Sequence, residues 1–186
     1  ITDGIITVAA VATDAAGNQN DDGSDTNNVV TLAVDTIFPT IAITSDKSAL
    51  KVGETATITF TLSEASTDFV VGDVTASGGT LSGFNGSGAI YTATFTPGAN
   101  SAVNGVVSVA SGRLSDAAGN QNNDGADSNN SVTIGVDTIA PTVALSSTKS
   151  VLNFGETAPI TFTLSEASND FTISDISVSG GTLNDF

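Results

Sequence analysis

Apolar and polar residues alternate along much of this chain, with the period of two that is typical of β-strands with one buried face. Valine, isoleucine and threonine dominate the alternating runs, and Gly, Asn, Asp and Pro separate them. No segment shows convincing helical spacing. The pattern predicts seven strands between residues 36 and 137, at 40–44, 55–63, 69–76, 79–84, 89–95, 105–114 and 131–136.

Seven strands in about 100 residues is the size of an immunoglobulin-like sandwich. The chain has no Cys and no Trp, so the disulfide and the core tryptophan of antibody domains are absent. The predicted fold class is all-β, with tandem seven-stranded immunoglobulin-like β-sandwiches. We expect the core to be filled instead by Phe60, Phe69, Phe84, Phe95, Val107 and Ile134.

The chain also repeats itself with an offset of 102 residues. Three pairs of segments show the repeat: VDTIFPT at Val34 and VDTIAPT at Val136, GETATITFTLSEASTDF at Gly53 and GETAPITFTLSEASNDF at Gly155, and DAAGNQN at Asp14 and Asp116. The spacing predicts that residues 1–35 are the C-terminal part of one repeat, that 36–137 form a complete repeat, and that 138–186 are the N-terminal part of a third.

Composition adds a strong acidic bias, because 20 acidic residues against four basic ones give a net charge of −16. Such a charge repels phosphate backbones and anionic lipid headgroups, so we expect no nucleic acid and no membrane surface as a partner. No run of about 18 apolar residues predicts membrane insertion, and no cleaved leader is recognisable within the chain. Clustered carboxylates favour divalent cations, and the absence of Cys and His leaves oxygen ligands for any bound ion.

Four motifs, VDTxxPT, TFTLSEA, YTATFTP and SDAAGN, resemble the tandem bacterial immunoglobulin-like extender repeats of giant RTX-type and biofilm-associated surface adhesins. The resemblance covers the whole chain. It implies a calcium-stiffened stalk at the bacterial cell surface, exported by type I secretion, that holds an adhesive domain away from the cell. The implied partners are calcium ions and neighbouring repeats of the same polypeptide or fibre.

The acidic residues converge if the topology is that of an immunoglobulin-like sandwich. The loop Ser115 to Asn130 then lies at the same end as the linker before the first strand and the turn after the second. Carboxylates gathered there repel one another unless a cation lies between them, and calcium accepts six to eight oxygens in a tolerant geometry. We expect one calcium ion held by Asp35, Glu64 and Asp116, with Asp68 beside it. Because the linker is short, such an ion would stiffen the joint between repeats.

The long loop itself offers a second set of oxygens in the spacing Asn120-x-Asn122-x-Asp124-Gly125, which resembles the start of an EF-hand loop without its closing Glu. A second ion would use Asn120, Asn122, Asp124 and Asp127. Turn chemistry explains the same residues, since Asp, Asn and Gly favour tight turns. Through the repeat, the partial sites contain Asp14, Asn18, Asn20, Asp22 and Asp25 on one side and Asp137 and Glu166 on the other. Asp46, Glu54 and Asp73 are interpreted as solvated surface charges.

Several alternatives stay open. The chain is either a window of a longer stalk or a fibre subunit in which the partial repeats of neighbouring chains pair. A carbohydrate- or ice-binding face could use Thr55, Thr57, Thr59 and Thr61, although alternating threonine is ordinary strand composition. A Lys47 to Asn130 isopeptide bond is a further alternative. Paired carboxylates can hydrolyse glycosides, but these acids recur with the repeat and the chain has one Tyr and no Trp, so we expect no enzyme.

Overall fold

The computed structural model describes residues 4–7, 12–21 and 25–186. The described part is all-β, as predicted, with short 3-10 turns and no α-helix. Contacts divide the chain into two units, Ile1–Thr138 and Ile139–Phe186, and each is described by itself.

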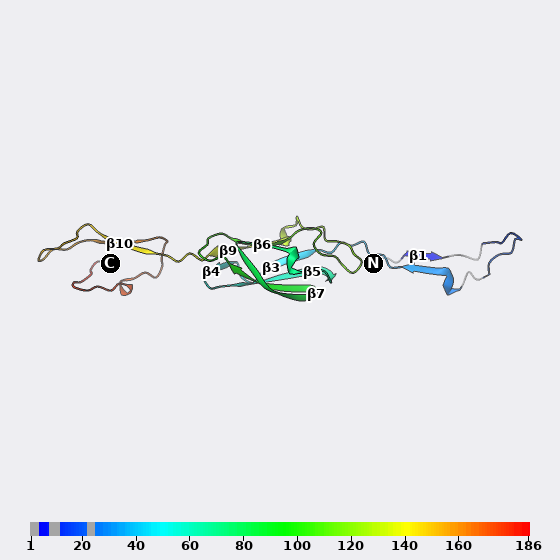
Figure 1. The fold of residues 1–186 in the computed structure, drawn as a ribbon, viewed down its shortest axis with the longest axis horizontal. Helices are drawn as coiled ribbons and strands as arrows, with labels where there is room; N and C mark the ends of the chain where they lie inside the picture. The colour runs from blue at the N-terminus through cyan, green and yellow to red at the C-terminus, as the bar shows by residue number, and fades with distance from the viewer. Residues whose placement is uncertain (1–3, 8–11, 22–24) are drawn as a thin grey trace. The chain divides into compact units, whose positions relative to one another are not determined.

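Two sheets form a sandwich in the complete repeat (Figure 1). The first sheet has the order β3-β5-β7 and contains β3 (Ile41–Ser45), β5 (Ala56–Ser66) and β7 (Gly79–Pro97). The second has the order β4-β9-β8-β6 and contains β4 (Ala49–Lys51), β6 (Val74–Ser77), β8 (Gly105–Val109) and β9 (Ser131–Asp137). All neighbouring strands are antiparallel except β4 and β9, which are parallel. The 3-10 turns η2 (Val71–Asp73) and η3 (Ser128–Asn130) precede β6 and β9.

Strand β5 shows how the alternating sequence produces this arrangement. Its sequence ATITFTLSEAS buries every second residue from Ala56 to Leu62, while Thr57 and Thr61 are exposed. A slip of one residue would reverse this and place the threonines in the core, so the register is strongly specified.

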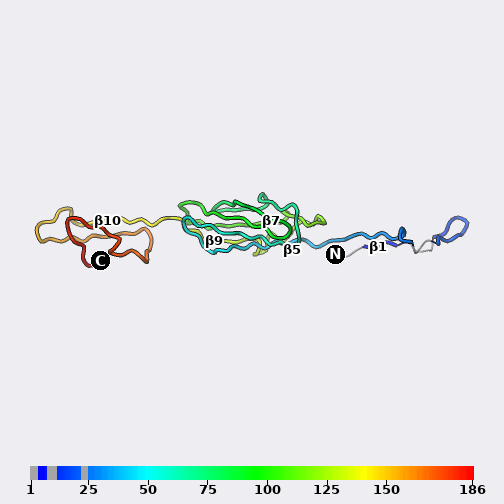
Figure 2. Tube along the Cα trace, turned by 90° about the horizontal axis from the view of Figure 1, so that it is seen from below, coloured from blue at the N-terminus to red at the C-terminus, as the bar shows by residue number. Residues whose placement is uncertain are grey.

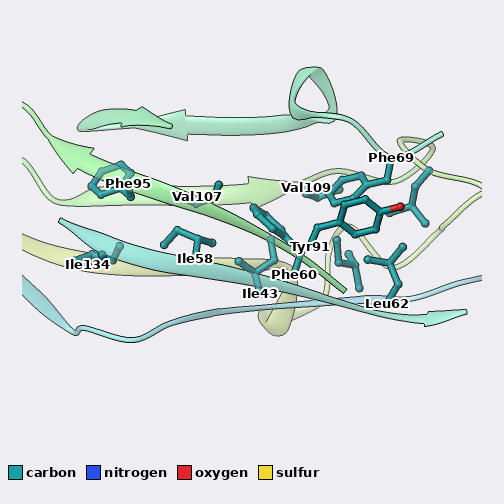
Figure 3. Close-up of a cluster of buried hydrophobic side chains, with 14 of the residues drawn as sticks. Ile43, Ile58, Phe60, Leu62, Phe69, Tyr91, Phe95, Val107, Val109 and Ile134 are labelled. Atoms are coloured by element: carbon teal, nitrogen blue, oxygen red, sulfur yellow. The ribbon is translucent and has the colours of Figure 1, made fainter. Parts of the chain in front are cut away.

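Aromatic side chains fill the core near the end of the sandwich that carries the linker. Phe60 and Phe69 meet edge to face with centroids 5.6 Å apart, and Phe69 and Tyr91 do so at 5.1 Å. Figure 3 shows these rings and the aliphatic side chains around them between the two sheets. The core prediction is confirmed: Phe60, Phe69, Phe95, Val107 and Ile134 are buried, and Phe84 packs against them half-buried.

The fourth and fifth predicted strands, 79–84 and 89–95, both lie within the single 19-residue run β7. A straight strand of that length would span about 60 Å, yet a side chain at Gly79 would collide with the backbone of Thr96, so the run folds back on itself. Positive φ angles of 149° at Gly86 and 65° at Gly88 produce the reversal.

Two predicted boundaries were wrong and one strand was missed. The predicted strand 105–114 ends at Val109, because a turn follows in which Gly112 has a φ of +72°. Residues 71–73 of the predicted strand 69–76 form η2 instead. Strand β4 was missed because three residues are too few to show an alternation.

The flanking segments repeat parts of this architecture. In the N-terminal segment, β1 (Gly4–Thr7) pairs with β2 (Val29–Leu32), which follows η1 (Thr26–Asn28). In the second unit, β10 (Val143–Ser147) pairs with β11 (Ile160–Leu164), and η4 (Ile173–Asp175) follows. Figure 2 traces the first segment in blue and the second unit in yellow to red. Phe162, Phe171 and Phe186 form a ring cluster equivalent to Phe60, Phe69 and Phe84.

Replacing Phe60 with Ala should therefore lower the free energy of unfolding of the complete repeat by about 3–5 kcal/mol, because it opens a cavity in the aromatic cluster. Urea unfolding followed by circular dichroism measures the change. Phe154→Ala is the control, since Phe154 is fully exposed, at 107% of its reference area, and should cost less than about 0.5 kcal/mol. Equal losses in the two variants would contradict the assigned core.

Candidate metal centre

The linker enters the complete repeat through Pro39, which is buried, before β3 begins at Ile41. Ahead of it, the Asp35 carboxylate accepts a hydrogen bond from the Ile37 amide at 3.1 Å. This local turn fixes the Asp35 side chain against its own backbone. The linker residue is half-buried although it lies outside any strand.

Glu64 lies at the same end of the sandwich, where the alternation of buried and exposed residues along β5 positions it. Residues 56, 58, 60 and 62 of β5 are buried, and Glu64 is the next position on that inward side. At this point the strand has passed the apolar core, so the carboxylate is half-buried at the rim.

Asp116 is held by the loop that follows β8. Its Oδ1 accepts hydrogen bonds from the amides of Ala118 at 2.8 Å and Asn120 at 2.9 Å, and its Oδ2 accepts one from Asn120 Nδ2 at 2.8 Å. The Asn120 side chain is the main cause that lowers the pKa of Asp116, and the bonds together outweigh the opposing effect of burial. Asp116 is therefore an oriented anion before any ligand binds.

These three carboxylates converge. Asp35, Glu64 and Asp116 each place one oxygen within 4.8 Å of the others. They come from the linker, the end of β5 and the loop after β8, and Asp116 is buried. A turn does not explain acids that meet from three separate segments, whereas a hard cation binds several carboxylate oxygens at once. The donors are all oxygen, which suits calcium or magnesium and not a soft metal.

Asn120 adds a contact to this group that needs no metal. Its Nδ2 donates to the backbone oxygen of Asp35 at 3.1 Å as well as to the Asp116 carboxylate. The linker is thus tied directly to the loop of the following sandwich.

The proposed second set of ligands is not brought together with the first. Asn122 uses its Oδ1 to accept the amides of Arg113 at 2.8 Å and Leu114 at 3.2 Å. Asp124 accepts the Ile41 amide at 2.7 Å and the Asn122 side chain at 3.1 Å. Both side chains are buried and brace the loop against the sandwich. Asp127 is exposed and precedes η3. These hydrogen bonds are those expected of a turn, and a second ion on this set stays a prediction.

Asp68 also lies outside the cluster of three. Its Oδ1 accepts the Ser66 hydroxyl at 2.6 Å and the Ser115 amide at 2.9 Å, and its Oδ2 accepts the Ser115 hydroxyl. Partial burial raises the pKa of Asp68, but the hydrogen bonds from Ser115 and Ser66 outweigh it and the net pKa is lowered. Asp68 therefore joins the turn after β5 to the loop after β8.

The N-terminal partial site repeats the loop geometry. Asp14 accepts the amides of Ala16 and Asn18 at 2.9 Å and the Asn18 side chain at 2.8 Å, and these bonds lower its pKa. Asn20 accepts the Ala12 amide at 2.9 Å, as Asn122 does for Leu114. Asp25 precedes η1, and Asp22 lies outside the described residues. In the other partial site, Asp137 ends β9, and Glu166 is exposed in the second unit.

The residues interpreted as solvated surface charges lie at the surface and also accept hydrogen bonds from backbone amides. Asp46 accepts the Thr57 amide at 2.7 Å, Glu54 the Lys51 amide at 3.2 Å and Asp73 the Val70 amide at 2.9 Å. Each carboxylate stabilises a turn between strands. Sequence alone gave no signal that separated these acids from solvated ones.

The Lys47 to Asn130 isopeptide alternative does not fit. Lys47 Nζ lies 3.8 Å from Glu54 Oε1. The pairing of β4 with Gly135–Asp137 places the chain after Lys47 beside the far end of β9. Asn130 lies just before β9 and five residues before Gly135, a separation of about 17 Å along an extended strand.

Replacing Ser115 with Ala should raise the pKa of Asp68 towards its ordinary value of 3.8, because the hydroxyl donor is lost. A lowered folded-state pKa contributes stability above the ordinary value that is lost as the pH falls through the folded value. The wild-type free energy of unfolding should thus fall more steeply below pH 3.8 than that of the variant. The Asp68 carboxyl carbon shift, titrated by NMR, measures the pKa directly. Replacement of the exposed Ser128 is the control, and an Asp68 titration that is unchanged in Ser115→Ala would contradict the assignment.

Comparison with known proteins agrees with the fold. The family described as bacterial Ig-like domain matches residues 35–134 and again 137–186. Searches of curated proteins and of solved structures returned no match. Within the described residues, none of the helices has the length and apolar character needed to cross a membrane. Domains of the matched family are typically non-enzymatic structural modules and are often extracellular. The two adjacent matches cover most of the sequence, so the chain belongs to the bacterial Ig-like domain family and consists of tandem repeats of it.

Proposed function

We propose that this chain is a stalk segment of a secreted bacterial adhesin, which calcium stiffens at the joints between repeats. The observation that carries the proposal is the convergence of Asp35, Glu64 and Asp116 within 4.8 Å. One ligand belongs to the linker and two belong to the following sandwich. A stalk of this kind acts at the bacterial cell surface, projects an adhesive tip and has no catalytic role.

The donor set fits calcium. Three carboxylates supply three to six oxygens, depending on how many bind in bidentate fashion, and calcium accepts six to eight with help from backbone and water. Magnesium requires a tighter octahedron and gives up its water reluctantly. Asp116 is already oriented by Asn120, so part of the entropy of ordering the site is lost during folding rather than on binding.

The position of the ligands explains how an ion would act on a joint. The linker between Asp35 and Pro39 has few residues, and Pro39 restricts its own φ and the conformation of Phe38. An ion that binds Asp35 together with Glu64 and Asp116 would remove the remaining bending freedom at the start of the sandwich. Extracellular modules bind calcium at about 0.1–1 mM, which matches calcium outside cells.

Calcium should raise the stability of the complete repeat. At about 100 times its dissociation constant, calcium adds about 2.7 kcal/mol to the folded state, a shift of the order of 10 °C in melting temperature for a unit of this size. Asp35→Asn and Asp116→Asn should each remove most of this shift, because each deletes one of three carboxylates. Calorimetric melting with calcium and with a chelator, and isothermal titration, measure the effect.

Asp127→Asn is the matched control, since Asp127 carries a similar charge in the same loop but is exposed and outside the cluster. It should keep the full calcium shift. Loss of the shift in Asp127→Asn with retention in Asp35→Asn would place the ion in the distal loop and contradict the junction site.

Exposed apolar faces favour a second candidate, in which the partial repeats pair with segments of another copy in a fibre. Ile6 is 61% exposed, whereas Val107, which holds the same place in the strand pairing of the complete repeat, is fully buried. Leu145 is 63% exposed, whereas its counterpart Ile43 is 5% exposed. Such faces need complementary strands, and the strands come either from neighbouring repeats of the same polypeptide or from a second chain.

Sedimentation velocity of the chain over a range of micromolar concentrations separates these two organisations. A fibre subunit should show a mass that grows with concentration, and Leu145→Asp should abolish the growth because it places a charge on the pairing face. Val52→Asp is the control, because Val52 is 69% exposed in the complete repeat. A mass that stays monomeric at every concentration would exclude the fibre.

No observation favours a carbohydrate-binding face. Thr57 and Thr61 are exposed on β5, but the repeat places Pro159 at the position of Thr57, so the threonine row is interrupted in the second unit. Alternating threonine is then explained by its strand propensity.

A further inference from the structure

Thr138, the residue after Asp137 in the motif VDTIAPT, is held by the sandwich that precedes it. Its amide donates to the Ser101 oxygen at 2.9 Å. Its hydroxyl donates to the Gly98 oxygen at 2.7 Å and accepts the Ser101 amide at 2.9 Å. The side chain is 6% exposed, so the turn between β7 and β8 encloses it. The start of the linker is therefore fixed to the repeat that it leaves.

Asp35, in the equivalent motif VDTIFPT, is held by the sandwich that follows it. Its backbone oxygen accepts the Asn120 side-chain amide at 3.1 Å. Asn120 has an equivalent in the other loop, Asn18, which makes the same bond to its own aspartate, Asp14. The position of the donor is thus a property of the repeat and not of one loop.

The two contacts fall on a single peptide unit when the repeats are superposed by their offset of 102 residues. Asp35 corresponds to Asp137 and Thr36 to Thr138. We propose that each Asp–Thr peptide group is hydrogen-bonded to both neighbouring repeats. The following repeat donates to its C=O through the asparagine side-chain amide, and the preceding repeat accepts from its N–H through the serine carbonyl. The hydrogen bonds of the threonine hydroxyl reinforce the contact with the preceding repeat. This inference deepens the stalk function proposed above and assigns Thr138, Ser101 and Asn120 as positioning residues.

The physical consequence depends on peptide planarity. The C=O and N–H of one peptide lie in a plane, and rotation about the bond between them faces a barrier of about 18–20 kcal/mol. No freely rotating backbone bond separates the hydrogen bond to the C=O from the hydrogen bond to the N–H. Successive repeats are then coupled through one rigid group, and this coupling is present without calcium. The cation, where bound, adds a second restraint through the side chain of the same aspartate.

The chain contains the contact with the preceding repeat once, at Thr138, and the contact with the following repeat once, at Asp35. Each contact can therefore be removed separately, in a chelating buffer, while the other serves as its control. Thr138→Val keeps the shape and removes the hydroxyl, so amide exchange at Ser101 and at position 138, measured by NMR, should rise about three- to tenfold, as expected for the loss of ordinary hydrogen bonds. Asn120→Ala removes the donor to Asp35, so the ¹⁵N order parameter of the Thr36 amide should fall from about 0.85 towards 0.6. Each variant should leave the other joint unchanged.

Matched variants control for simple loss of packing. Thr138→Ser keeps the hydroxyl and should retain wild-type exchange, and Thr36→Val should leave position 138 unaffected. Asn18→Ala removes the equivalent bond to Asp14 and should leave the Thr36 amide ordered. Unchanged exchange at Ser101 in Thr138→Val, or an ordered Thr36 amide in Asn120→Ala, would overturn the proposal. Because calcium is absent throughout, a failure here leaves the calcium site standing, and a failure of calcium binding leaves this inference standing.

Discussion

The inward face of β5 is the constraint on which the rest of the structure depends. Ile58 and Phe60 are fully buried on it, and the other sheet packs against them. Since a one-residue slip would put this face in water, the register is fixed along the buried part of the strand, Ala56 to Leu62. The pairing with β7 shifts between Thr61 and Ser66, but the alternation of burial along β5 continues and leaves Glu64 half-buried at the rim on the inward side. A residue that could bind an ion is therefore positioned by the burial of apolar side chains earlier in the same strand.

The aspartates at this end of the sandwich act mainly through hydrogen bonds with backbone and amide donors. Asp116 and Asp68 both have lowered pKa values because amides and hydroxyls donate to them, against the opposing effect of burial. Such bonds keep the carboxylates ionised to lower pH than an ordinary aspartate and fix their directions. An anion that is oriented in advance, beside two other carboxylates, favours a divalent cation over a proton.

Sequence predicted the sandwich, its core and the convergence of three acids, because the period of two and the internal repeat are long-range signals. It did not separate the residues that face the linker from those that stabilise the loop, since Asn122 and Asp124 are the same residue types as Asn120 and Asp116 and differ only in what surrounds them. It missed β4, whose three residues show no alternation. It also missed the role of Thr138, although the recurrence of VDT was the signal that could have indicated it.

The loop after β8 is repeated almost letter for letter because it meets two sets of constraints at once. Its first half, Asp116 and Asn120, faces the linker and binds the backbone of Asp35. Its second half, Asn122 and Asp124, faces the sandwich and binds the loop backbone and the start of β3. A change in the second half would move the first, because one residue separates Asn120 from Asn122 and the Asn122 amide donates to the Leu114 oxygen, two residues before Asp116. The geometry of the joint is thus inherited from the packing of the loop, so a stalk built from such repeats would have joints of equal geometry wherever this loop recurs.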